Sequence, residues 1–208
     1  MRPRSADALL SLSTQLREHT APLHREIEIL LRLPGAICGR ADYQDWLGRF
    51  LGLYDPLERS LAAFSEWESF GLSRLSRDHS GCLVDDLAAL GIDSRELSRA
   101  SPALLPDLPT FAHGLGALYV IEGATLGGQM ILRDLEPRIG AAIAGATRFF
   151  GGRGATVGPM WQSFRAALDG FGLEQPQLRA GVVVGAERTF RAMLVWFAPF
   201  CAGRRGQS

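Results

Sequence analysis

The residue with the clearest chemical potential is His24, one of four histidines in the chain. If its segment is helical, residues three, four and seven positions away share its face. That face combines a basic residue, a hydroxyl, a carboxylate and two apolar side chains: Arg17, Thr20, Ile27, Glu28 and Leu31. A carboxylate one turn after an imidazole can accept one ring N–H, as is common for metal-ligating histidines. His19, His79 and His113 are not singled out by their patterns, and we expect them at the surface or at helix ends.

Two interpretations of His24 remain open on spacing alone. A lone histidine on a half-apolar helix is more ordinarily a partly buried, hydrogen-bonded side chain. The sequence contains no HExxH or ExxH pairing, so a metal bound only by protein side chains would have few ligands. A single protein ligand instead suits a metal whose other positions are filled by a macrocycle, as in haem.

A second stretch, from Gly123 to Gln129, carries three glycines within a longer apolar run. Each glycine costs a helix interior roughly 1 kcal/mol relative to alanine. The residues around them still recur at helical spacing: Leu115, Leu118, Tyr119, Glu122, Leu126 and Met130. Such a segment is either a tight helix crossing or a flat wall against which a planar ligand can lie, because glycine has no Cβ to hold a neighbour away. With His24 opposite, the wall would complete a site for a planar ligand.

The rest of the chain has the periodicity of helices and no strand alternation, which predicts an all-α fold in one domain of seven to nine helices over residues 1–208, with a core at about 14–200. Pro22 implies a kink or a restart of the first helix, with Thr20 as a possible N-cap for the part that follows. Asp42 can cap the second helix and Pro56 is expected to bend it. Gly91 is expected to end the third helix. The predicted helices cover 5–32, 42–67, 79–90, 110–138, 158–171 and 177–200, with connections at 101–109 and 145–158.

Composition excludes several classes of protein. The 22 cationic side chains are all arginine and are balanced by 22 acidic ones, which argues against nucleic-acid binding through a general basic surface. Three separated cysteines without a CxxC pair predict neither a disulfide framework nor a structural zinc site and favour the cytoplasm: Cys38, Cys82 and Cys201. The sequence has no signal-peptide core and no uninterrupted apolar stretch of the roughly 18–20 residues that a membrane span needs, so we expect no membrane span.

Both stretches resemble one known family. The segment from Leu16 to Glu28 looks like the proximal helix of haem oxygenases, with its threonine, histidine and following glutamate. The segment from Tyr119 to Gln129 is similar to their glycine-kinked distal helix. Its amino-acid sequence is most similar to the bacterial branch, which includes enzymes that supply biliverdin to bacteriophytochromes. The resemblance covers about Thr14 to Phe200, and the order and separation of the two motifs also fit.

The resemblance implies a multi-helix fold with haem held between the proximal and the distal helix. His24 would be the iron ligand, with Glu28 as its partner. Gly123 and Gly127 would be the catalytic distal glycines that let haem and oxygen approach the helix backbone. Further haem contacts would come from the distal segment and from cations that bind the propionates: Arg17, Tyr119, Gly128, Arg133 and Arg165.

The reaction implied by the resemblance is oxidative cleavage of haem to biliverdin, carbon monoxide and ferrous iron. Haem would be both substrate and cofactor, with molecular oxygen as co-substrate. Electrons would come from a separate reductase or ferredoxin, because no flavin or nicotinamide motif is present. A biliverdin-binding phytochrome is a candidate acceptor of the product.

Ala124 is a departure from the family pattern, since many haem oxygenases carry an aspartate there that holds water near the bound oxygen. This leaves open a haem carrier or sensor of the same fold. A haem-free enzyme on the scaffold, such as a thiamin-degrading relative, would need a cysteine or carboxylate cluster in the core. A helical interaction module would leave the glycines unexplained.

Overall fold

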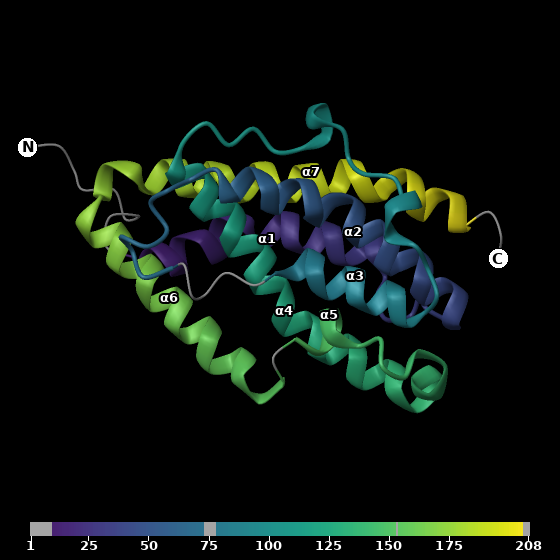
Figure 1. The fold of residues 1–208 in the computed structure, drawn as a ribbon. Helices are drawn as coiled ribbons and strands as arrows, with labels where there is room; N and C mark the ends of the chain where they lie inside the picture. The colour runs from purple at the N-terminus through teal and green to yellow at the C-terminus, as the bar shows by residue number, and fades with distance from the viewer. Residues whose placement is uncertain (1–9, 73–77, 153, 206–208) are drawn as a thin grey trace, which may run out of the picture.

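The computed structural model describes residues 10–72, 78–152 and 154–205, and these contain helices and no strand, as predicted. Seven α-helices form the bundle (Figure 1): α1 (Leu12–Leu31), α2 (Arg40–Ala62), α3 (His79–Ala89), α4 (Phe111–Ile139), α5 (Arg148–Gly151), α6 (Val157–Glu174) and α7 (Arg179–Arg205). Short 3₁₀ helices join them: η2 (Ser94–Glu96), η3 (Pro102–Leu104), η4 (Gly140–Ile143), η5 (Gly154–Thr156) and η6 (Pro176–Leu178). The all-α prediction is confirmed.

The first helix differs from the prediction in its internal structure. α1 runs through Pro22 without restarting, and its N-cap is Ser11, whose side chain accepts the Thr14 N–H. Thr20 is therefore not a cap, and its hydroxyl donates to the Leu16 carbonyl at 2.8 Å. Proline inside a helix costs about 3 kcal/mol, and we attribute the continuity to the apolar stripe that α1 packs against α7 and α6. The predicted start at residue 5 lies outside the described residues.

The second and third helices show what sets their ends. α2 begins after Gly39, and Asp42 caps it from within the first turn by accepting the Cys38 N–H at 2.8 Å. It ends at Ala62, before the predicted Trp67, whose indole N–H instead donates to the Leu61 carbonyl. α3 begins at His79 and ends just before the Gly91 turn, as predicted. Pro56 lies inside α2, and the helix continues through it without interruption.

α7 is the central packing partner, because α1 and α4 both pack against it, and α4 then runs away from it toward α5 (Figure 1). The crossing with α4 depends on two glycines that face each other's helix. A Cβ on Gly116 would collide with the Val182 carbonyl, and one on Gly185 would collide with the His113 carbonyl. A tight glycine crossing therefore exists, but it lies before the 123–129 segment rather than at Gly123 or Gly127.

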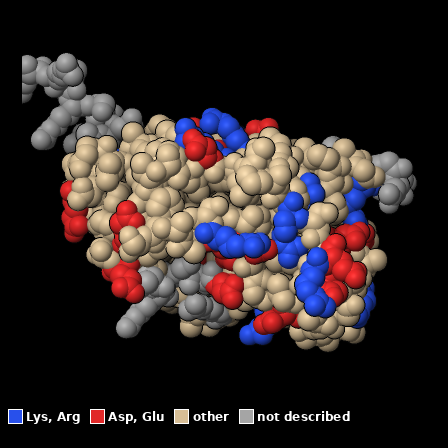
Figure 2. Space-filling view, turned by 45° about the horizontal axis from the view of Figure 1, so that its top comes forward, with Lys and Arg blue, Asp and Glu red and all other residues tan. Residues whose placement is uncertain are grey.

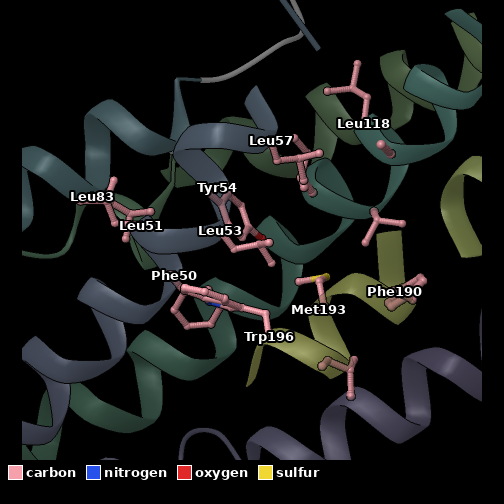
Figure 3. Packing of buried hydrophobic residues seen from close by; sticks show 14 of the residues in the cluster. Phe50, Leu51, Leu53, Tyr54, Leu57, Leu83, Leu118, Phe190, Met193 and Trp196 are labelled. Atoms are coloured by element: carbon pink, nitrogen blue, oxygen red, sulfur yellow. The ribbon is translucent and has the colours of Figure 1, made fainter. Parts of the chain in front are cut away.

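The core fills the space between α2, α3, α4 and α7 (Figure 3). Phe50 of α2 packs against Phe197 of α7 with ring centroids 5.1 Å apart, and Trp196 carries the Arg49 guanidinium 3.5 Å above its ring. Leu83 of α3 and Leu118 of α4 belong to the same cluster and lie at opposite ends of it in Figure 3. This core fixes the helices that carry the site.

Charges of both signs alternate on the face shown in Figure 2, without a continuous basic surface there. No disulfide joins Cys38, Cys82 and Cys201, all of which the structure describes. Among the described residues, one stretch, Phe111–Ile143, is long and apolar enough to cross a membrane by composition. That is weak evidence for a span, because the central helix of a bundle has the same properties and α4 packs along α7.

Candidate functional site

His24 projects from the side of α1 that the core leaves uncovered. Its side chain is 59% exposed, and its Nδ1 lies 3.4 Å from Oε2 of Glu28, one helical turn on. Its ring meets Phe190 of α7 edge-on, with centroids 5.9 Å apart. No described residue hydrogen-bonds the other ring nitrogen, Nε2. The imidazole is thus oriented by a carboxylate and an aromatic ring and can offer Nε2 to a ligand.

Thr20 of α1 and the Tyr119 hydroxyl of α4 lie close enough, beside this histidine, for Thr20 to lower the pKa of that hydroxyl. Thr20 is buried and Tyr119 is half-buried. Burial raises the pKa of the Tyr119 hydroxyl, and the neighbouring Thr20 hydroxyl and the charges of Arg165 and Arg17 partly offset this rise. His24 lies one turn beyond Thr20, and Gly123 lies one turn beyond Tyr119, about 6 Å along each axis. His24 and the start of the glycine segment therefore each lie about one helical turn from this contact, on α1 and on α4.

Two of the three predicted propionate-binding arginines lie at this end of the site. Arg17 and Arg165 are both near enough to Tyr119 for their charges to lower its pKa. Arg165 also donates to the Ser13 hydroxyl at 3.4 Å, and Arg17 makes no ion pair with a described residue. Arg133 lies 14 residues after Tyr119, or about 21 Å along α4. It is exposed and separate from the other two cations.

One face of α4 is open and apolar after Tyr119. A Cβ built on Gly127 would meet no atom within 4 Å, and Met130 beside it is 71% exposed. Leu126 on the same face is 37% exposed. Gly123 differs, since its Cβ would lie 3.4 Å from the Trp161 indole of α6. Gly127 is the glycine with open space beside it, and Trp161 borders the site at Gly123.

Gly128 has a different environment from the one expected. It is buried, and a Cβ there would lie 2.9 Å from the Phe150 carbonyl oxygen of α5. Asp86 holds α5 in place by accepting the backbone N–H groups of Arg148 and Phe149. Burial raises the pKa of Asp86, although these two hydrogen bonds oppose the rise. The geometry therefore assigns Gly128 to the packing of α4 on α5, not to the open face.

Sequence reasoning missed three residues that border the site: Thr20 as a bridge, Phe190 and Trp161. Phe190 and Trp161 contact His24 and Gly123 from α7 and α6, far along the chain. Trp161 also packs on Tyr119, with centroids 5.5 Å apart. The periodicity of α6 and α7 shows that both rings face inward, but it does not show which helix they meet.

The sequence patterns also did not indicate a buried polar cluster beside the glycine segment, formed by Glu58, His79 and Glu122. The expectation for His79 was right about its place at a helix start and wrong about its exposure, since the residue is only 1% exposed. Its ring lies between Glu58 of α2 and Glu122 of α4. Glu122 was the available signal, because a carboxylate in a long apolar run needs a buried partner. His19 is exposed and His113 bonds Thr110 at the start of α4, as expected.

The arrangement suits a flat, apolar ligand that carries a metal and acidic groups on one edge. An exposed imidazole can ligate the metal, an uncovered glycine face can lie against the plane, and two arginines can hold the acidic edge. The described residues contain no cluster of three His, Cys, Asp or Glu side chains that would hold a bare metal ion. The family model described as "Heme oxygenase" matches residues 10–199. A comparison with curated proteins finds no match.

Proposed function

The chain belongs to the haem oxygenase family, and from this we propose that it cleaves haem oxidatively to biliverdin, carbon monoxide and ferrous iron. The observation that carries the proposal is the pairing of a ligand-ready imidazole with an open glycine face. His24 is oriented by Glu28, and Gly127 has no atom within 4 Å of where a Cβ would lie. When bound, haem supplies the iron that activates oxygen and is itself the substrate that is oxidised.

His24 ligates the haem iron through Nε2 in this proposal. Glu28, 3.4 Å from Nδ1, would accept a hydrogen bond from the Nδ1–H, which would fix the tautomer and leave the other nitrogen for the metal. Phe190 limits rotation of the ring from the α7 side. As a neutral ligand, this imidazole would leave the iron less electron-rich than a thiolate would.

Arg17 and Arg165 bind the propionates, which leave the macrocycle from one edge. Guanidinium groups suit this because their paired donors match a carboxylate. Tyr119 lies near both arginines, whose charges lower its pKa, and it would border the propionate end of the pocket together with Thr20. Arg133 can reach only the opposite end of the pocket. The propionate contacts therefore fix how the haem is rotated, and with it which meso carbon is attacked.

The open face of α4 forms the distal wall. Gly127 lets the plane approach the helix backbone, whereas Met130 and Leu126 exclude water from its apolar edge. Gly123 and Trp161 close the wall on the side of the arginines. We assign electron supply to a separate reductase or ferredoxin in the bacterial cytoplasm, with a biliverdin-binding phytochrome as the candidate product acceptor.

A haem carrier or sensor is the second candidate, and Ala124 is the observation that favours it. The residue is exposed next to Gly123 and carries no polar group that could hold a proton there. Such a protein would bind haem through the same residues without turnover.

One experiment separates the two candidates. We expect hemin to bind the apo-protein with one-to-one stoichiometry and a Soret band. Reductant in air, with catalase present, should then bleach that band and give biliverdin and carbon monoxide. A known haem oxygenase serves as the control for the reductant. Stable binding without bleaching in that same assay would establish the carrier or sensor, and no binding would reject both candidates.

A further inference from the structure

The glycine segment of α4 has a buried charge immediately before it. Glu122 is the one Asp, Glu, Lys or Arg side chain between Phe111 and Leu132, and the residue is 7% exposed. A carboxylate in such surroundings loses its hydration and is stable only with a polar or charged partner. Its position directly before Gly123 means that whatever holds it also holds the start of the distal wall.

His79 of α3 is that partner. Its Nε2 lies 3.8 Å from Oε1 of Glu122, a charge-pair distance, and its Nδ1 lies 2.8 Å from Oε1 of Glu58. The Tyr54 ring packs beside the imidazole at 5.6 Å. One buried imidazole therefore connects a carboxylate of α2 with a carboxylate of α4.

Glu58, the carboxylate that α2 contributes, is held in place by several hydrogen bonds. Glu58 accepts the backbone N–H groups of His79 and Ser80 at 2.9 and 3.0 Å, and the Ser80 hydroxyl as well. These are the first N–H groups of α3, where a carboxylate is also favoured by the helix dipole. Burial raises the pKa of Glu58, but the hydrogen bonds from His79 and Ser80 outweigh it and leave that pKa below its ordinary value. The anchored carboxylate fixes the imidazole, which in turn fixes Glu122.

We infer that Glu58, His79 and Glu122 are positioning residues, a buried carboxylate–imidazole–carboxylate chain that holds the glycine segment of α4 in place for haem cleavage. The inference rests on the proposed function. These three side chains act through the backbone of α4. The Thr125 hydroxyl also donates to the Glu122 carbonyl at 2.7 Å and stabilises the same helical turn. The distal wall is thereby held from its protein side by charge.

Packing alone would not require these charges. Well-packed apolar residues of similar volume commonly replace a buried ion pair without loss of stability. A double variant, His79→Leu with Glu122→Leu, therefore keeps the volume and leaves Glu58 with its α3 hydrogen bonds. Glu122→Gln removes one charge with almost no change of shape. Asp55→Asn is the matched control, because Asp55 is a similarly covered carboxylate on α2, one turn before Glu58, and pairs with Arg59 and Arg99 instead.

The first measurement uses the apo-protein and does not depend on haem. Hydrogen exchange of the peptide covering residues 119–130 should accelerate about tenfold in Glu122→Gln and in the double variant, and not in Asp55→Asn. Unchanged exchange in both Glu122 variants would overturn the inference whatever the protein does with haem. Global unfolding transitions measured alongside show whether a variant has simply lost its fold.

The second measurement follows single-turnover haem degradation against pH. We expect haem affinity within about twofold of wild type, a rate lowered about tenfold and a displaced pH profile in Glu122→Gln, none of which occurs in Asp55→Asn. Among the described residues, the groups that contact the imidazole include Tyr54, Glu58 and Glu122. Accelerated exchange with an unchanged rate and profile would overturn the catalytic significance of the chain. A wild type that binds haem without degrading it would reject the proposed function, while the exchange result would still decide whether the chain positions α4.

Discussion

At the scale of single residues, the site depends on how each side chain is oriented, not only on its type. His24 is the example, because Glu28 and Phe190 fix its ring from two sides while Nε2 remains accessible. The sequence spacing correctly predicted that Glu28 lies beside His24, because residues four positions apart are neighbours on a helix. Phe190 depends on how α7 packs against α1, which no local pattern encodes.

Removing the Glu28 charge tests this orientation. Glu28→Gln should weaken hemin binding about tenfold, the lower end of the effect for a partner of a metal-ligating histidine, because both side chains are exposed to water. Glu26→Gln is the control, since Glu26 is exposed and two positions from His24, on another face of α1. Hemin titrations followed at the Soret band measure both affinities. Equal weakening by the two variants would contradict a specific partnership.

The arginines make a second prediction at this scale. Arg17→Ala and Arg165→Ala should each weaken hemin binding about 5- to 10-fold, or about 1–1.4 kcal/mol, and reduce the preference for hemin over its dimethyl ester. Arg133→Ala should leave that preference unchanged, because Arg133 lies about 21 Å along α4 from Tyr119. Competition between hemin and the ester distinguishes the two ends of the pocket. A loss of preference only in Arg133→Ala would place the propionates at the other end.

At the scale of elements, α4 uses its glycines for three different purposes. Gly116 permits the crossing with α7, Gly128 permits contact with α5, and Gly127 leaves an open face. In the sequence these glycines are alike, and both the wall and the crossing were reasonable interpretations. The difference comes from partner helices whose positions depend on contacts far along the chain, such as Asp86 with the N-terminus of α5.

Alanine substitutions should separate these purposes. Gly127→Ala should stabilise the apo-protein by roughly 1 kcal/mol, since its methyl group meets no atom and alanine favours the helix. For a chain of this size that corresponds to about 2–4 °C in Tm. Gly116→Ala should destabilise by about 1–3 kcal/mol or more, because its methyl group would collide with the Val182 backbone. Thermal unfolding measures both.

Haem binding completes that comparison. Gly127→Leu should fold normally and weaken hemin binding at least about tenfold, because the larger side chain occupies the space of the macrocycle. A Gly127→Leu protein that binds hemin as tightly as wild type would show that the haem plane lies elsewhere.

At the scale of the whole molecule, the fold was largely predictable from sequence and the polar interior was not. Helical periodicity gave the main helices, because each buries an apolar stripe against the bundle. It overestimated the effect of Pro22, because packing along α1 outweighs a missing hydrogen bond. His79 was misjudged for the opposite reason: its burial depends on Glu58 and Glu122 from two other helices.

The half-buried carboxylate of Glu58 makes the free energy of unfolding depend on pH. The pKa of Glu58 is lowered on folding from an ordinary value of 4.5, so its contribution to the free energy of unfolding is present above that value and is lost as pH falls through the lowered pKa. The difference in stability between wild type and Glu58→Gln should therefore be largest at neutral pH and shrink as pH falls below 4.5. Urea unfolding across this range measures it, with exposed Glu96→Gln as the control. A difference that does not vary with pH would contradict a charged, hydrogen-bonded Glu58.

The central claim is that haem bound through His24 is opened by this protein, and the most direct test restores the ligand chemically. Hemin complexes of wild type, His24→Gly, and His24→Gly with added imidazole are reduced in air with catalase present, and the products are identified. We predict biliverdin and carbon monoxide from wild type, none from His24→Gly, and recovery with imidazole. Equal biliverdin formation by His24→Gly without imidazole, or a wild-type complex that stays intact, would contradict the account.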